Sequence, residues 1–170
     1  MQVESPAVIA LGSNLGDREQ TIREAVRRID ALGGVKVLKT SSLVETPALK
    51  PAGVDVDAPA YLNAVVAVRT SLAPQELLRE LHGIEAAMGR VRDIRWGDRT
   101  LDLDIIAFAG PPIDEPDLTV PHPRAHERAF VLAPWLEIEP DALIPGRGTV
   151  ADLLVATADH PTPYPAEPLS

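Results

Sequence analysis

The segment LDLDI at residues 101–105 alternates acidic and aliphatic side chains, and its acidic members are Asp102 and Asp104. Side chains two positions apart on a β-strand point to the same side, so a strand here would place both carboxylates on one face. Two neighbouring carboxylates form a hard anionic site that suits Mg²⁺, which keeps several waters and accepts phosphate oxygens as further ligands. The same alternation is also typical of a half-buried strand whose acidic face is solvated.

Four arginines precede this pair within ten residues, namely Arg90, Arg92, Arg95 and Arg99. In a chain whose net charge is −9, a local cluster of cations predicts a site for a small anionic ligand. Transfer of a phosphoryl-type group depends on positioning and on stabilisation of the developing charge by metal ions and arginines. The carboxylate pair and the arginine cluster together favour Mg²⁺-dependent transfer from ATP. The alternative for the arginines is a solvated loop in which they form ion pairs with acidic residues of the same loop.

Aromatic and amide side chains near these charges could bind a flat heterocycle. Trp96 lies in the arginine-rich loop, and Tyr61 and Asn63 would share one face of a strand. An aromatic ring beside an amide is suited to a planar, hydrogen-bonding ligand. The alternative for Trp96 is packing on the core, and the alternative for Tyr61 and Asn63 is ordinary packing within the sheet.

Hydrophobic periodicity predicts the elements that must position these residues. Strands are expected at 8–11, 35–44, 61–70 and 101–108. Asp17 is placed to cap a helix that Gly33-Gly34 ends, and Pro74 suits the first turn of a second helix. Shorter helices are expected around 126–132 and 150–155.

The order β-α-β-β-α-β predicts an α+β fold, a ferredoxin-like split βαβ sandwich with a small C-terminal helical appendage. Both long helices would cover one face of the sheet, and the other face would be covered by loops or left for a ligand. A single domain is expected over residues 1–156. The Pro-rich tail, residues 157–170, is expected to be largely disordered.

Composition and missing motifs exclude several functions. The acidic net charge disfavours nucleic acid as a partner, because gripping a phosphate backbone needs a basic surplus. The chain has no cysteine, no secretory signal and no apolar run long enough to span a membrane, so a cytoplasmic protein is expected. There is no P-loop motif, a GRGTVA string at 146–151 lacks the βαβ context of a dinucleotide site, and His122 and His126 lack a third zinc ligand.

Several ordered motifs together resemble one known family. They are ALGSNLG at 10–16, ETP at 45–47, YLNA at 61–64, IE at 84–85, GRVR at 89–92, RWGDRTLDLDI at 95–105 and VPHP at 120–123. The chain is similar along residues 8–154 to the 6-hydroxymethyl-7,8-dihydropterin pyrophosphokinases of folate biosynthesis. The resemblance implies transfer of the β,γ-diphosphate of ATP to the hydroxymethyl oxygen of the pterin, with release of AMP.

The resemblance also implies roles for individual residues. Asp102 and Asp104 would bind two Mg²⁺ ions together with ATP, and Arg90 and Arg99 would assist the transfer as catalytic residues. The residues implied for ATP are His82, Glu85, Arg92, Arg95, Trp96, Ile105, Thr119, His122 and Arg128. Those implied for the pterin are Gly12, Thr46, Pro47, Leu49, Tyr61, Asn63, Trp96 and Phe130. Loops 47–60 and 89–99 would close over the substrates.

Some residues depart from the family pattern, and two other functions stay open. Asp98 stands where proline is common, Asp93 where lysine is common and His82 where glutamine is frequent, which affects fine positioning rather than the metal pair. One is a non-catalytic ligand-binding module of the same fold. Such a module would need a pocket, but it would not need a carboxylate pair facing an arginine-rich loop. A kinase acting on another heterocycle is the third possibility. A monomer without nucleic-acid or membrane partners is expected.

Overall fold

The computed structural model describes residues 4–14, 17–46, 49–50, 53–54, 60–88, 101–157, 161–166 and 168–169. The strands of the main sheet are β1 (Ser5–Ser13), β2 (Val35–Thr40), β3 (Leu43–Thr46), β6 (Tyr61–Thr70), β7 (Asp102–Phe108) and β12 (Thr162–Tyr164). The helices are α1 (Arg18–Asp30), α2 (Pro74–Ala87), α3 (Ala129–Ile138) and α4 (Val150–Ala156), with a 3₁₀ turn η1 (Ala125–Glu127). Three short hairpins are β4 (Leu49–Lys50) with β5 (Gly53–Val54), β8 (Ile113–Glu115) with β9 (Leu118–Val120), and β10 (Leu143–Ile144) with β11 (Gly148–Thr149).

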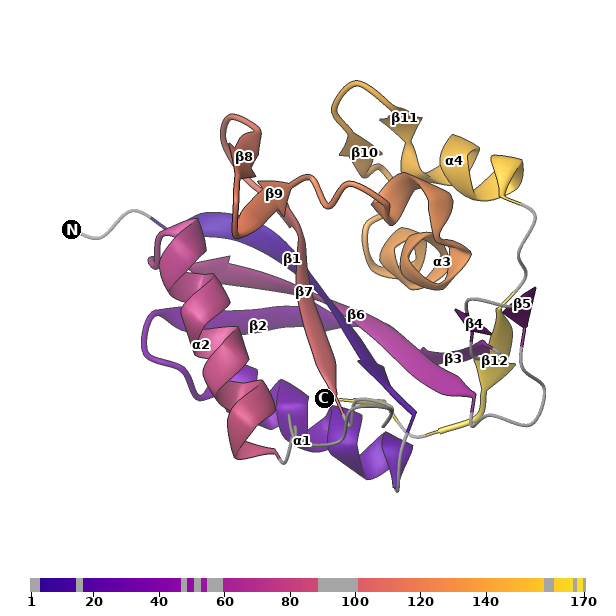
Figure 1. Ribbon diagram of the computed structural model, residues 1–170, viewed down its shortest axis with the longest axis horizontal. Helices are drawn as coiled ribbons and strands as arrows, with labels where there is room; N and C mark the ends of the chain where they lie inside the picture. The colour runs from indigo at the N-terminus through magenta and orange to yellow at the C-terminus, as the bar shows by residue number, and fades with distance from the viewer. Residues whose placement is uncertain are drawn as a thin grey trace.

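The main sheet is built from antiparallel pairs in the order β12-β3-β6-β1-β7, and β2 also pairs with β6. The predicted strands at 61–70 and 101–108 are confirmed almost to the residue. The strand predicted at 35–44 is divided into β2 and β3. Ser41 lies at the division, where its hydroxyl oxygen accepts from the Val65 amide and its own amide donates to the Val65 carbonyl, each at 2.9 Å. The protein therefore has a mixed α/β fold around an antiparallel sheet (Figure 1).

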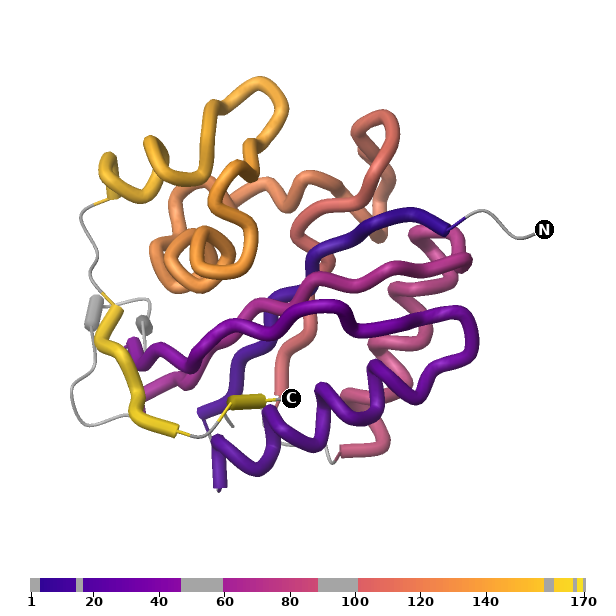
Figure 2. Tube along the Cα trace, turned by 180° about the vertical axis from the view of Figure 1, so that it is seen from behind, coloured from indigo at the N-terminus to yellow at the C-terminus, as the bar shows by residue number. Residues whose placement is uncertain are grey.

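Helices α1 and α2 pack on one face of the sheet, as predicted (Figures 1 and 2). The Asp17 carboxylate accepts from the Gln20 amide at 3.1 Å, which confirms the predicted cap. Ile22, Val26 and Ile29 follow at helical spacing and are buried against the sheet.

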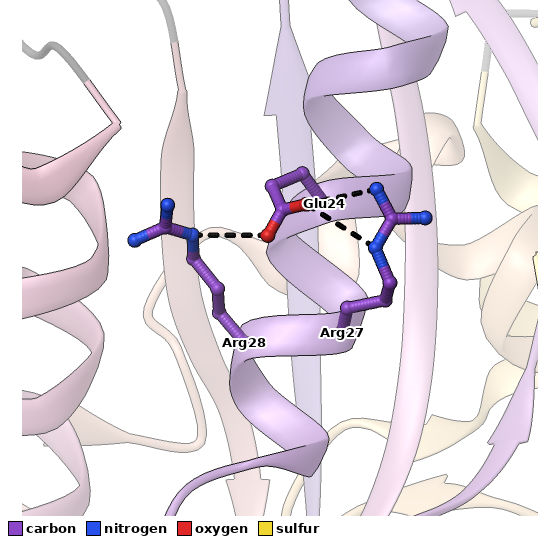
Figure 3. Close-up of polar contacts among 3 residues, drawn as sticks. All are labelled: Glu24, Arg27 and Arg28. Atoms are coloured by element: carbon purple, nitrogen blue, oxygen red, sulfur yellow. Dashed lines mark hydrogen bonds and ion pairs between the residues drawn. The ribbon is translucent and has the colours of Figure 1, made fainter.

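The outer face of α1 is charged. Glu24 accepts from Arg27 at 2.8 Å and from Arg28 at 3.1 Å (Figure 3), and the hydrogen bond from Arg27 is the main cause that lowers the pKa of Glu24. No helix in the described part of the chain is long and apolar enough to cross a bilayer.

Helices α3 and α4 cover part of the opposite face, where the sequence left a choice between loops and a ligand. Leu132 and Trp135 of α3 and Val150 of α4 are buried in a second apolar cluster, together with Val8 and Ile106 of the sheet. Figure 2 shows both helices on the side of the sheet away from α1 and α2. The ends of β1 and β6 beyond α3 instead line a cavity, so this face both packs against helices and forms a recess.

The C-terminal tail differs from the expectation of disorder, because residues 162–164 form β12 and pair with β3. The guanidinium of Arg18 lies 5.8 Å from the ring centroid of Tyr164, and Arg18 also donates to Glu45 of β3 at 2.8 Å. Further along, Arg23 donates to the Pro168 carbonyl at 2.8 Å. The tail is thus ordered by contacts with the edge of β3 and with Arg18 and Arg23 of α1. The composition of the tail itself does not predict these contacts.

Candidate active site

One cavity of about 420 Å³ opens between the uncovered end of the sheet and the start of α3. It is lined by residues of β1, β3, β6, β7, η1 and α3 together with the two arginines that flank η1. The lining residues are Ala10, Leu11, Gly12, Thr46, Tyr61, Asn63, Ala64, Asp102, Asp104, Arg124, Glu127, Arg128, Phe130 and Val131. Acidic, basic, aromatic and amide side chains therefore meet in one recess.

The two carboxylates expected on one face of a strand both line this cavity. Asp102 and Asp104 are half-buried in β7, opposite Gly12 and Ala10 of β1. Leu103, between them, is buried on the helix-covered face of the sheet. The side-chain period of two in β7 thus separates the acidic residues from the core.

Glu85 of α2 connects that helix to the acidic strand. Its side chain is 3% exposed, and Oε2 accepts from the backbone amide of Leu103 at 2.9 Å. The resemblance implied that Glu85 lies near ATP. In the structure Glu85 bonds to the backbone between Asp102 and Asp104, which positions the strand that carries them.

Replacing Glu85 by alanine should lower the free energy of unfolding by about 1 to 3 kcal/mol, because the buried Leu103 amide loses its acceptor. Urea unfolding followed by circular dichroism measures this difference. Glu80, exposed on the same helix, is the matched control, and Glu80→Ala should change the free energy by less than about 0.5 kcal/mol. Equal stabilities for Glu85→Ala and Glu80→Ala would contradict the positioning role.

The segment between β9 and α3 brings cations to the other side of the cavity. Arg128 is half-buried, and its guanidinium lies 5.7 Å from the centroid of the Phe130 ring. Burial lowers the pKa of Arg128, the charge of Arg124 adds to this effect, and Asp104 opposes it. Arg124 is exposed and is paired with Glu127, with Nε 3.7 Å from Oε2.

His122 lies just before these arginines and is half-buried. Burial lowers the pKa of His122, and the charge of Asp104 acts in the opposite direction. The backbone amide of Arg124 donates to Nδ1 at 3.2 Å, so the proton of the neutral ring is on Nε2. His122 can therefore act as a neutral hydrogen-bond donor near the carboxylates.

The remaining wall of the cavity is suited to a flat polar ring. Asn63 is 6% exposed, and its Nδ2 donates to the Thr46 hydroxyl at 3.0 Å, which fixes the orientation of the amide. A β-carbon at Gly12 would lie 3.0 Å from Oδ1 of Asn63, so glycine makes room for the amide there. Tyr61 of β6 and Phe130 of α3 supply the aromatic surface of the recess.

The structure brings many of the expected residues together and places others elsewhere. Of the pterin set, Gly12, Thr46, Tyr61, Asn63 and Phe130 line the cavity, and of the ATP set, Arg128 does. His82 is exposed on α2, Ile105 is buried in the core on the side of α1 and α2, and Thr119 is half-buried on β9 opposite Asp114. Leu49 belongs to β4 and pairs with Val54. Pro47, Arg90, Arg92, Arg95, Trp96 and Arg99 lie outside the described residues.

Arg124 and Glu127 line the cavity although neither the sequence pattern nor the family resemblance assigned them a role. Their spacing to Arg128 is four residues and one residue, so one helical turn brings the three charges together. The spacing of these charges in the segment PRAHER could have predicted that they lie together.

The donor set fits a hard divalent cation. Asp102 and Asp104 offer carboxylate oxygens, and Mg²⁺ commonly takes one or two carboxylates and completes its shell with water and phosphate. No group of three or more potential metal ligands occurs among the residues that the structure describes. A cation bound by this pair would need further ligands, which water or phosphate oxygens can supply.

The chain matches one family of known proteins. A family model described as 7,8-dihydro-6-hydroxymethylpterin-pyrophosphokinase (HPPK) matches residues 8–140. The 2-amino-4-hydroxy-6-hydroxymethyldihydropteridine pyrophosphokinase of Bacillus subtilis is 49% identical over 132 residues, which are 78% of this chain and 77% of that protein. The enzyme of the same name from Haemophilus influenzae is 41% identical over 154 residues, 91% of this chain and 94% of that protein.

Solved structures share the fold at lower identity. The wild-type HPPK-DHPS of Plasmodium falciparum with STZ-DHP matches with a TM-score of 0.67 and 15% identity, covering 91% of this chain and 43% of that one. The wild-type protein with pteroate matches with a TM-score of 0.68 and 17% identity, covering 91% of this chain and 42% of that one. This chain thus spans less than half of the length of those longer proteins.

Proposed function

The chain belongs to the 7,8-dihydro-6-hydroxymethylpterin-pyrophosphokinase family, and we propose that it transfers the diphosphate of ATP to 6-hydroxymethyl-7,8-dihydropterin in folate biosynthesis. The observation that supports this most directly is the composition of the cavity. It combines a carboxylate pair and two arginines with an amide and two aromatic rings. The charged groups suit a nucleotide phosphate chain with its metal, and the amide and rings suit a pterin.

The reaction forms one bond and breaks one bond. The hydroxymethyl oxygen of the pterin attacks the β-phosphorus of ATP, and the bond from that phosphorus to the oxygen bridging to the α-phosphate breaks. AMP leaves with that bridging oxygen, the pterin keeps the β- and γ-phosphates, and the hydroxyl proton passes to solvent. Such a transfer depends on alignment of the two substrates and on neutralisation of the phosphate charge.

Asp102 and Asp104 would hold Mg²⁺, which would neutralise phosphate charge when bound. Arg128, half-buried beside the pair, adds a cation that cannot lose its proton at neutral pH. His122 offers an Nε2 proton to a phosphate oxygen without adding a charge. These groups act on the nucleotide from two sides of the cavity.

Asn63 would orient the pterin. Its Nδ2 bonds to Thr46, so Oδ1 is the group left to accept a hydrogen bond from a ring N–H. Tyr61 and Phe130 come from opposite layers, the sheet and α3, and would contact the ring faces.

We also propose that the fold is the ferredoxin-like split βαβ arrangement. The central order β7-β1-β6, followed by β2 and β3, supports it, as does the packing of α1 and α2 in one layer.

The nucleotide product of the reaction tests the function. Incubation with ATP, Mg²⁺ and 6-hydroxymethyl-7,8-dihydropterin should give AMP and a pterin diphosphate in equal amounts, measured by ³¹P NMR and anion-exchange chromatography. Omission of either substrate is the control and should give neither product. Formation of ADP, or no turnover at saturating Mg²⁺, would overturn the proposal.

A further inference from the structure

The 3₁₀ turn η1 holds one arginine at each of its ends. Arg124 is its N-cap residue and Arg128 its C-cap residue. The Arg128 amide donates to the Ala125 carbonyl at 3.2 Å, and Ala125 is fully buried in the cluster shared with α3 and α4. Both side chains therefore start from a turn that is fixed to the body of the protein, and both line the cavity.

The two arginines differ in their surroundings. Arg128 is half-buried and lies over the Phe130 ring, whereas the Arg124 side chain is 68% exposed. The partner of Arg124 is Glu127, whose side chain is 57% exposed, and their closest atoms are 3.7 Å apart. An exposed pair at this separation, beyond ordinary hydrogen-bond length, adds little stability, so a better anion can replace the glutamate.

The charge balance of the cavity makes each of its cations important for binding a phosphate chain. Asp102, Asp104 and Glu127 contribute three carboxylates to the lining, and Arg124 and Arg128 are the cations among the described lining residues. A triphosphate adds further negative charge even when it carries Mg²⁺. Guanidinium groups bind phosphate oxygens through two parallel N–H donors. Each arginine within reach of a phosphate group therefore raises the affinity for it.

We propose that Arg124 is a second arginine for the phosphate chain of the nucleotide, and that it exchanges Glu127 for a phosphate oxygen when the nucleotide binds. Glu127 is then the counter-ion of Arg124 before the nucleotide binds, and its charge opposes a nearby phosphate. The inference rests on the proposed function, because it assigns Arg124 to the ATP of that reaction.

Arg124→Ala should raise the KM for ATP about tenfold, the change expected when one charge-assisted hydrogen bond is lost at a partly exposed site. The KM for the pterin and the kcat at saturating ATP should each change by less than about threefold. Arg124→Lys should recover part of the affinity, since it restores the charge without the planar donors. Arg147 is exposed and lies outside the cavity lining, so Arg147→Ala removes the same charge as a matched control.

Glu127→Gln tests the exchange of partners. It should lower the KM for ATP about twofold, because Arg124 no longer has a competing carboxylate, and this gain should shrink when Arg124 is alanine. Calorimetry with α,β-methylene-ATP gives the same comparison as dissociation constants. An unchanged KM for ATP in Arg124→Ala, or the same gain from Glu127→Gln in both backgrounds, would overturn the inference.

These outcomes separate this inference from the proposed function. If wild-type protein forms AMP and Arg124→Ala has the KM of the Arg147→Ala control, the function stands and the role of Arg124 fails. If wild-type protein forms no AMP, the function itself fails.

Discussion

Asp104→Ala should reduce kcat by about 10³-fold or more, because the Mg²⁺ that we propose for this site would lose one of its two protein carboxylates. The free energy of unfolding should change by less than about 1 kcal/mol. Without a cation, Asp102 and Asp104 repel each other on one face of β7, and removing one charge relieves this repulsion. That gain offsets the lost attraction of Asp104 for Arg128.

Steady-state kinetics over a range of Mg²⁺ concentrations, together with urea unfolding, measures both expectations. Asp114, exposed in the β8–β9 hairpin, provides the control, and Asp114→Ala should leave kcat within about twofold. Near-normal turnover of Asp104→Ala would contradict a metal role. A loss of activity accompanied by loss of folded structure would show that Asp104 is needed for the fold instead.

Asn63→Ala should raise the KM for 6-hydroxymethyl-7,8-dihydropterin about 100-fold and change the KM for ATP by less than about threefold. Removing a buried amide that hydrogen-bonds a polar ring lowers the affinity for that ring strongly, because the N–H donors of the ring are then desolvated without an acceptor. Asn63 is 6% exposed, so water cannot easily replace the amide.

Thr46→Val is the informative companion to Asn63→Ala. It removes the hydroxyl that accepts from Asn63 Nδ2 and leaves the amide itself in place. We expect the KM for the pterin to rise about fivefold, which corresponds to a less well oriented amide. Calorimetric titration of the pterin in the presence of α,β-methylene-ATP checks both variants. Equal effects of the two substitutions would mean that Asn63 acts on the fold of the cavity wall and not on the ligand.

The local periodicity of the sequence predicted the parts of the site that lie within single elements. The period of two in residues 101–108 places Asp102 and Asp104 on one face, and β7 confirms that orientation. Asp17 as a cap and Pro74 as the first residue of a helix were also predicted correctly, because both are local preferences of the backbone.

Features that depend on contacts between distant segments could not be predicted in this way. The cover on the second face of the sheet comes from α3 and α4, whose packing on Val8 and Ile106 joins residues far apart in the chain. The order of the tail depends on the free edge of β3 and on Arg18, neither of which is encoded near residue 162. The expected catalytic residues Arg90 and Arg99 lie outside the described residues, so their roles stay predictions.

The pairing of β12 with β3 also bears on intermolecular association through the edge of the sheet. A bare edge strand is a template for intermolecular β-pairing, and β3 would be the outermost strand at its end of the sheet if the tail were missing. Pro163, in the middle of β12, has no N–H to offer to a further strand. β12 therefore covers the edge that β3 would otherwise present to another strand.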